Sequence, residues 1–106
     1  MSLEVNNENL ADILSAKKIT LLQFSASWCG PCKMLSPIML NLSDEYSNKD
    51  ISIGKINVDS HSEIGIKYSV RNIPTLIFLK DGVEVDRTVG LQTKDILQGK
   101  IDALLN

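Results

Sequence analysis

The sequence contains two cysteines, Cys29 and Cys32, with Gly30 and Pro31 between them. They lie where an apolar run ends and a helical pattern begins, so the pair is expected at a helix N-terminus. Unpaired backbone N–H groups and the positive end of the helix dipole favour a thiolate there, and this lowers the pKa of the thiol. The spacing therefore predicts a reactive dithiol that can close into a small disulfide ring.

The two thiols differ in their expected positions. Cys29 precedes the first helical turn and is expected to face solvent beside Trp28. Cys32 lies one turn into the helix, where Cys29 and the first turn would shield its sulfur. We therefore expect Cys29 to be the better placed nucleophile, since the thiolate is the reactive form.

Three other interpretations of the pair are weaker. A structural zinc ion needs four ligands, whereas this chain offers one cysteine pair and a single histidine, His61, elsewhere in the sequence. A purely structural disulfide that closes so short a loop would stabilise little. Cysteines that merely fill the core would not explain the Gly-Pro between them or the Trp28 before them. No metal is expected.

Hydrophobic patterning predicts the elements that position the pair. In chain order, they are a helix over 7–16, a dense strand over 19–26, a long helix over 31–46, a strand over 51–58, a short helix over 60–68, strands over 75–79 and 83–89, and a final helix capped by Thr93. The first strand–helix–strand unit requires parallel strands, and Asp81-Gly82 predicts an antiparallel hairpin. The chain is thus expected to be one α/β domain, residues 1–106, with a central mixed sheet.

Two of these helices are expected to bury an apolar stripe. In the long helix the stripe comprises Met34, Leu35, Ile38, Met39 and Leu42, and in the final helix Ile96, Leu97, Ile101, Leu104 and Leu105. Pro37 lies inside the long helix and is expected to kink it, because proline removes one backbone hydrogen bond.

Composition and charge exclude several classes of function. The net charge is −2 and the longest basic run is Lys17-Lys18, so a nucleic-acid partner is not expected. No apolar run approaches the roughly 20 residues that cross a bilayer. The first 14 residues lack the basic and apolar regions of a signal peptide, and we expect a cytoplasmic monomer without a membrane partner.

The residues around the cysteines resemble the active-site signature of the thioredoxin family, Trp-Cys-Gly-Pro-Cys-Lys over 28–33. The similarity extends over nearly the whole chain, in order and at the family's spacing: residues 24–28, Pro37, residues 55–59, 68–79 and 80–82, and Val89-Gly90. This resemblance implies the thioredoxin fold, a three-layer α/β/α domain.

The resemblance also implies the activity of a protein-disulfide reductase. Cys29 would attack a disulfide of a substrate protein, and Cys32 would resolve the mixed disulfide. No cofactor is implied beyond the redox-active Cys29–Cys32 disulfide, and a thioredoxin reductase would recharge the protein. Gly-Pro between the cysteines is typical of the reducing members, whereas glutaredoxins typically carry Cys-Pro-Tyr-Cys.

A docking surface for substrates follows from the same resemblance. The Ile73–Pro74 bond would be cis and face the cysteines, so that Ile73 can pair with an extended substrate chain. The flat, mostly apolar surface would comprise Trp28, Gly30, Pro31, Ile73, Pro74 and Gly90.

The chain departs from the family at two positions that flank the site. The position six residues before the first cysteine is usually a buried Asp beside a lysine, whereas this chain has Gln23 beside Lys55; Ser25 replaces a frequent second Trp. An amide accepts no proton at physiological pH, so Gln23 cannot act as general base. The alternative is that Gln23 only bonds the backbone or Lys55, and that Lys55 extends to solvent or to Asp59.

Two other functions remain open from the sequence. The domain could be a binding module that docks a partner through its apolar face, or an oxidase or isomerase variant, given Gln23 in place of the carboxylate. Trapping of mixed disulfides by a Cys32→Ser variant would separate an oxidoreductase from a binding module.

Overall fold

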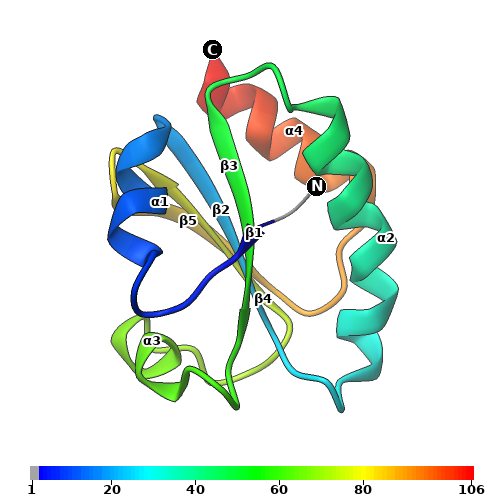
Figure 1. The fold of residues 1–106 in the computed structure, drawn as a ribbon. Helices are drawn as coiled ribbons and strands as arrows, with labels where there is room; N and C mark the ends of the chain where they lie inside the picture. The colour runs from blue at the N-terminus through cyan, green and yellow to red at the C-terminus, as the bar shows by residue number, and fades with distance from the viewer. Residues whose placement is uncertain (1–2) are drawn as a thin grey trace.

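The structure is a computed structural model that describes residues 3–106, and it consists of a central sheet between two layers of helices (Figure 1). The elements are β1 (Leu3–Glu4), α1 (Leu10–Ala16), β2 (Ile19–Ser25), α2 (Gly30–Glu45), β3 (Ile51–Asn57), α3 (Ser62–Lys67), β4 (Thr75–Lys80), β5 (Val83–Val89) and α4 (Lys94–Leu105). This arrangement confirms the predicted three-layer α/β/α fold.

The five strands are ordered β1-β3-β2-β4-β5 in the sheet. β2 is central and pairs parallel with β3 and antiparallel with β4. A parallel β2–β3 pair requires a crossover, which α2 supplies. Asp81 and Gly82 both have positive φ, at 52° and 80°, as the tight turn between β4 and β5 requires. The predicted mixed sheet is therefore confirmed.

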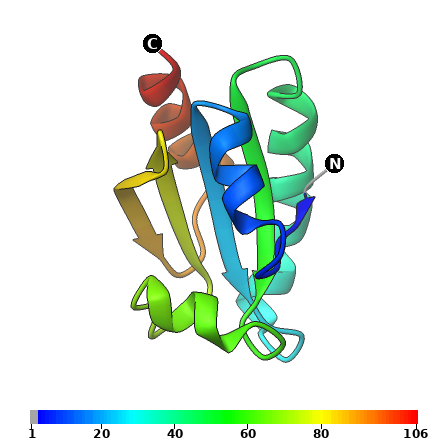
Figure 2. The ribbon, with the colours of Figure 1, turned by 60° about the vertical axis from the view of Figure 1, so that its left-hand side comes forward.

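Each face of the sheet packs against one layer of helices. α2 and α4 cover one face, where Leu21 of β2 lies in a cluster with Leu35 and Leu97. α1 and α3 cover the other face, which comes forward in Figure 2. On this face Phe24 packs in a cluster with Ile64. All seven residues of β2 are buried, which explains why this strand is dense rather than alternating in sequence.

Two features near the N-terminus differ from the sequence-based prediction: a strand that was missed and the start of the first helix. β1 was not predicted, because two residues that pair with β3 carry no periodic pattern. α1 begins at Leu10 rather than at residue 7, because the carbonyl oxygen of the Asn6 side chain accepts hydrogen bonds from the N–H groups of Glu8 and Asn9. This local turn replaces the first turn of the expected helix.

The predicted apolar stripes were too wide. Met34 is 62% exposed and Ile96 is 47% exposed. In α2 the sheet-facing line runs through Leu35, Met39 and Leu42, and a residue next to such a position is turned by about 100° around the axis. Met34 and Ile96 each precede a buried leucine and are therefore rotated toward solvent.

Pro37 lies inside α2, which runs without a break from residue 30 to residue 45. The expected kink stays a prediction. Within residues 3–106, no helix has the length and apolar character needed to cross a membrane.

Candidate active site

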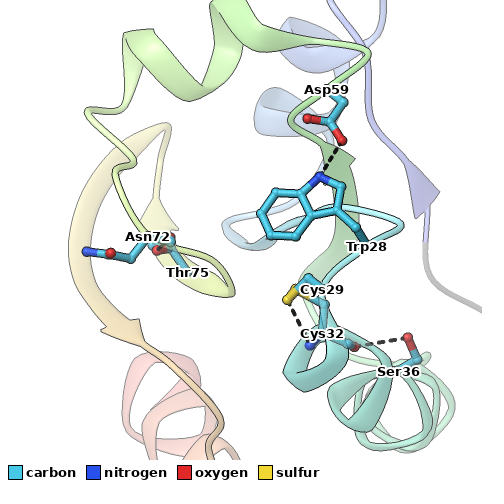
Figure 3. Close-up of a disulfide and its surroundings, with 7 residues drawn as sticks. All are labelled: Trp28, Cys29, Cys32, Ser36, Asp59, Asn72 and Thr75. Carbon is cyan, nitrogen blue, oxygen red and sulfur yellow. Dashed lines mark hydrogen bonds between the residues drawn. A yellow bond between two sulfur atoms is a disulfide. The ribbon is translucent and has the colours of Figure 1, made fainter.

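The cysteine pair lies at the end of the sheet where β2 stops and α2 starts (Figure 3). Cys29 and Cys32 form a disulfide, with their Cα atoms 5.3 Å apart. Cys29 is the N-cap residue of α2, and Pro31 lies in the first turn, where its missing N–H costs no hydrogen bond. The predicted location at a helix N-terminus is confirmed.

A backbone donor points at the sulfur of Cys29. The N–H of Cys32 donates to Cys29 Sγ at 3.2 Å, as an N–H of the first turn does to the oxygen of a Ser N-cap. This donor, together with the dipole of a 16-residue helix, stabilises negative charge on Cys29. The site therefore favours the thiolate of Cys29 once the disulfide is reduced.

Both sulfur-bearing residues are shielded in the disulfide form. Cys29 is 4% exposed and Cys32 is 2% exposed, so the expectation that Cys29 faces solvent was wrong for this state. The two residues form a buried cluster with Ala26, and Val58 and Ile73 pack against that cluster. These contacts come from the residues that directly follow β2 and β3 and from the segment before β4, and no local sequence pattern indicates them.

The expected docking residues surround the disulfide. Trp28 is 68% exposed, Gly30 and Pro31 are exposed, and Ile73 is half-buried against the cysteines. The Ile73–Pro74 bond is cis, as predicted. Pro74 itself is buried, so it belongs to the support of this surface rather than to its exposed part.

Gly90 joins the support of the same segment. Its N–H donates to the carbonyl oxygen of Pro74 at 2.8 Å. Its φ of +89° lies in the region that favours glycine, which explains why a glycine occupies this predicted loop position.

Two features beside Trp28 were missed by sequence reasoning. Its indole N–H donates to Asp59 Oδ2 at 2.8 Å, which orients the exposed ring (Figure 3). A cavity of about 270 Å³ lies next to the ring, lined by Trp28, Val58, Ser62, Gly65, Ile66, Val70, Arg71 and Ile73. Trp28 follows β2 and Asp59 follows β3, and the ends of these parallel strands meet at one edge of the sheet. The predicted parallel pairing could therefore have indicated that Asp59 lies near Trp28.

Gln23 lies beneath the site on the face covered by α2. It pairs in register with Lys55 of β3 and is 1% exposed. Its Nε2 atom has no hydrogen-bond partner among the residues that the structure describes. A cavity of about 200 Å³ includes Gln23, Ser36 and Lys55 in its lining, and a second of about 260 Å³ includes Ser36, Lys55 and Cys32.

The expected neighbourhood of Gln23 and Lys55 is thus present, although within residues 3–106 no hydrogen bond joins their side chains. Ser36 connects this neighbourhood to the disulfide, because its hydroxyl donates to the carbonyl oxygen of Cys32 at 3.3 Å. In the described part of the chain, no group of three or more His, Cys, Asp or Glu residues is arranged to hold a metal ion.

The fold and the site together define a class of protein. A cysteine pair that closes into a disulfide at a helix N-terminus can carry out thiol–disulfide exchange, and the cis-proline segment beside it is the one that the family resemblance implied. This geometry is that of a thiol–disulfide oxidoreductase.

Comparisons with known proteins agree on the family. The family model Thioredoxin matches residues 1–103. Thioredoxin from Chlamydia caviae is 48% identical over 93 residues, 88% of each chain, and that from Chlorobaculum thiosulfatiphilum is 43% identical over 100 residues, 93% of this chain and 92% of the relative. The structure of a mutant thioredoxin from Halobacterium salinarum superposes with a TM-score of 0.92 at 36% identity, over 99% of this chain and 91% of the other.

The chain belongs to the thioredoxin family. Its activity is that of a protein-disulfide reductase, as the resemblance in the sequence implied.

Proposed function

We propose that Cys29 is the attacking nucleophile and Cys32 the resolving thiol. The Cys29 thiolate would attack one sulfur of a protein disulfide, forming a mixed disulfide and releasing the other sulfur as a thiolate that takes up a proton. Cys32 would then lose its proton and attack Cys29 Sγ. The substrate leaves with two thiols, and the two electrons that it gained come from the protein, which is left as the Cys29–Cys32 disulfide.

One observation carries this assignment. The N–H of Cys32 donates to Cys29 Sγ at 3.2 Å, and Cys29 is the N-cap residue, whereas Cys32 lies within the first turn of the helix. A thiolate at the N-cap receives the donor and the helix dipole, and the thiolate is the attacking form. No cofactor other than the cysteine pair takes part in these steps.

The substrates would be disulfide-containing proteins that dock on the surface around Trp28. Gly30, Pro31 and Ile73 leave this surface mostly apolar, and Ile73 offers backbone groups to an extended chain. A thioredoxin reductase would return the disulfide to the dithiol. The protein would act as a monomer in a reducing compartment such as the cytoplasm, where disulfides are transient and catalytic.

A Cys32→Ser variant tests this assignment. It keeps the nucleophile and removes the resolving thiol, so it should accumulate mixed disulfides with protein substrates under non-reducing conditions. Cys29→Ser is the matched control and should trap none. Trapping through Cys32 in the control would mean that the two cysteines have the reverse roles, whereas docking that does not depend on either thiol would support the alternative of a pure binding module.

We propose further that water rather than a carboxylate receives the proton of Cys32. Gln23 stands where relatives usually have a buried Asp, and an amide cannot accept a proton near neutral pH. The two cavities that share Ser36 and Lys55 extend from Gln23 to Cys32, and Gln23 Nε2 is a buried donor without a partner in the described part of the chain. Cavities of this size, lined in part by polar side chains, have room for water that makes two or more hydrogen bonds.

The Gln23→Asp variant tests the water route. A carboxylate at this buried position would have a raised pKa, so its cost appears as pH rises through that pKa. At pH 7 the oxidised variant should be less stable than the unaltered protein by about 1–3 kcal/mol, because Lys55 offsets only part of the desolvation. The rate of protein-disulfide reduction should depend more steeply on pH in the variant, measured from roughly pH 6 to 9.

Denaturant midpoints of both oxidised proteins give the stability difference. Gln23→Leu, which offers neither donor nor acceptor, is the control for packing at this position. Equal midpoints and superimposable pH profiles for Gln23→Asp would mean that Gln23 only fills space and bonds its neighbours.

A further inference from the structure

Residues 69–74 connect α3 to β4 and form one wall of the surface beside the disulfide; we call them the docking segment. Val70, Arg71 and Ile73 of this segment line the cavity of about 270 Å³ next to Trp28. Ile73 also packs against the cluster that contains both cysteines. The position of the docking segment therefore determines the shape of the surface that a substrate protein meets.

The C-terminal end of the docking segment is held by two hydrogen bonds. The hydroxyl of Thr75 donates to the carbonyl oxygen of Asn72, and the N–H of Gly90 donates to that of Pro74. One donor, Thr75, is the first residue of β4, and the other, Gly90, directly follows β5. This end of the segment is thus anchored to the ends of β4 and β5.

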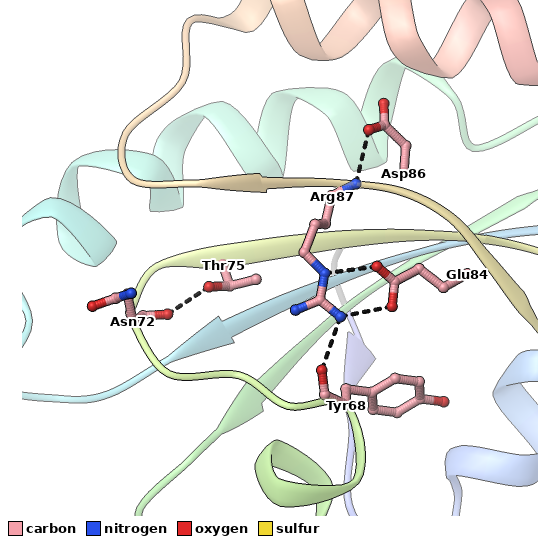
Figure 4. A network of polar contacts seen from close by, with 6 residues as sticks. All are labelled: Tyr68, Asn72, Thr75, Glu84, Asp86 and Arg87. Carbon is pink, nitrogen blue, oxygen red and sulfur yellow. Dashed lines mark hydrogen bonds and ion pairs between the residues drawn. The ribbon is translucent and has the colours of Figure 1, made fainter.

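The N-terminal end is held to α3 by the N–H groups of Ser69 and Val70, which donate to the carbonyl oxygens of Ile66 at 3.0 Å and Gly65 at 2.9 Å. A side chain from β5 adds the contact that ties this end to the sheet. Arg87 Nη2 donates to the carbonyl oxygen of Tyr68 at 2.8 Å, immediately before the segment begins (Figure 4). Ser69, the next residue, has a φ of +56°, which non-glycine residues rarely adopt. The chain therefore turns sharply at the point where Arg87 binds it.

Glu84 orients the guanidinium group for this contact. Arg87 Nε donates to Glu84 Oε2 at 2.6 Å, and Nη2 donates to Glu84 Oε1 at 2.7 Å (Figure 4). This two-bond pairing fixes the plane of the guanidinium, so that Nη2 can also reach the backbone of Tyr68. Lysine has no planar group and cannot reproduce this set of contacts.

We infer that Arg87 is a positioning residue for substrate docking: by bonding Tyr68 and Glu84 at once, it ties the docking segment to β5. Arg87 acts on the wall of the cavity beside Trp28 and takes no part in thiol–disulfide exchange itself. This inference rests on the proposed function, in which protein substrates dock on that surface.

A second ion pair on the same strand provides a matched control. Lys100 of α4 bonds Asp86 of β5 at 2.7 Å, and its side chain is 33% exposed, close to the 32% of Arg87. This pair joins β5 to the helical layer on the opposite face and so leaves the docking segment untouched. Loss of either partly exposed pair should have a similarly small effect on stability.

The experiment compares Arg87→Gln, Arg87→Lys and Lys100→Gln with the unaltered protein. Each reduced protein is mixed with increasing concentrations of insulin as the protein disulfide, and separately with a small aromatic disulfide that releases a coloured thiolate. Arg87→Gln should raise the half-saturating insulin concentration by roughly 3- to 10-fold, with the limiting rate changed by less than about twofold. Its rate with the small disulfide should not change, because that substrate needs no docking segment.

Arg87→Lys should recover part of the loss, and Lys100→Gln should behave as the unaltered protein with both substrates. Should Arg87→Gln fail to fold, Glu84→Gln removes the orienting carboxylate and carries the same comparison. Equal half-saturation for Arg87→Gln and Lys100→Gln would overturn the inference, and so would an equal loss of rate with insulin and with the small disulfide. Mixed-disulfide trapping by Cys32→Ser would still report separately on the proposed function.

Discussion

The two ends of α2 are held in different ways. At the N-terminal end, the polar contacts are local to the helix: Cys32 N–H reaches Cys29 Sγ, and the hydroxyl of Ser36 donates to the carbonyl oxygen of Cys32. At the C-terminal end, Glu45 bonds Lys94 and Gln98 of α4, and the hydroxyl of Tyr46 donates to Asp102 Oδ1 at 2.7 Å.

The two ends of α2 therefore serve different purposes: the N-terminal end carries the cysteine pair, and the C-terminal end anchors the helix to α4. At the reactive end the polar contacts surround the cysteine pair, and Trp28 and Pro31 are exposed, as the proposed docking of substrates requires. The opposite end is bonded to a second helix, and the buried line of Leu35, Met39 and Leu42 joins both ends to the sheet. Changes at the first end should therefore remove activity with little loss of stability, and changes at the second should do the reverse.

The largest expected effect is at the reactive end. Cys29→Ser removes the proposed nucleophile, so reduction of a protein disulfide should fall by on the order of 10³-fold or more. The free energy of unfolding of the reduced protein should change by no more than about 1 kcal/mol, because serine is a good N-cap residue whose hydroxyl can accept the Cys32 N–H and so offset the smaller volume of oxygen. Activity assays and denaturant titrations of the two reduced proteins check this, and comparable losses in both would contradict the separation.

Leu42→Ala tests the supporting half of the helix. Leu42 is fully buried, so the truncation should destabilise the protein by about 2–5 kcal/mol. Under conditions where the variant is folded, its rate with a small disulfide should match that of the unaltered protein. Leu40→Ala is the control, because Leu40 is 48% exposed and its loss should cost no more than about 0.5 kcal/mol. A variant that stays stable but loses its rate would show that the two ends are coupled.

Tyr46 should make stability depend on pH in the alkaline range. Burial raises the pKa of Tyr46 to about 12, and the hydrogen bond to Asp102 adds to the rise. The ordinary pKa is about 10, so the contribution is fully present below pH 10 and is lost as pH rises toward 12. Midpoints measured from pH 8 to 12 should therefore fall more steeply for the unaltered protein than for Tyr46→Phe.

Burial also raises the pKa of Tyr68, so Tyr68→Phe is the control that separates the two tyrosines. That variant should retain the alkaline loss due to Tyr46. Parallel curves for the unaltered protein and Tyr46→Phe would mean that the Tyr46 hydroxyl does not help to hold the C-terminal end of α2.

The smallest effect is expected at the exposed ion pair of the supporting end. Lys94 and Glu45 are 33% and 43% exposed, so Lys94→Gln should destabilise by at most about 1 kcal/mol, and less at high salt. Denaturant midpoints at low and high salt measure this. A larger, salt-independent loss would mean that the pair contributes through packing rather than charge.

Much of the fold could be predicted because its signals are local. The dense strand before Cys29, the Asp81-Gly82 turn and the Thr93 cap are encoded within a few residues each. Thr93 Oγ1 indeed accepts from the N–H of Ile96, and the turn has the expected positive φ values. The exposure of Met34 could not be predicted in this way, because a helical period states which residues share a line but not where the sheet lies.

The features of the site divide in the same way, into those set by local sequence and those set by tertiary contacts. The sequence by itself determined a cysteine pair at a helix N-terminus and an amide at position 23, since both depend on residue type and short spacing. Only the tertiary structure decided that Asp59 orients Trp28, 31 positions away in the chain, and that Arg87 holds Tyr68, 19 positions away. Contacts of that range arise when strands and loops meet at one edge of the sheet, and no local pattern encodes them.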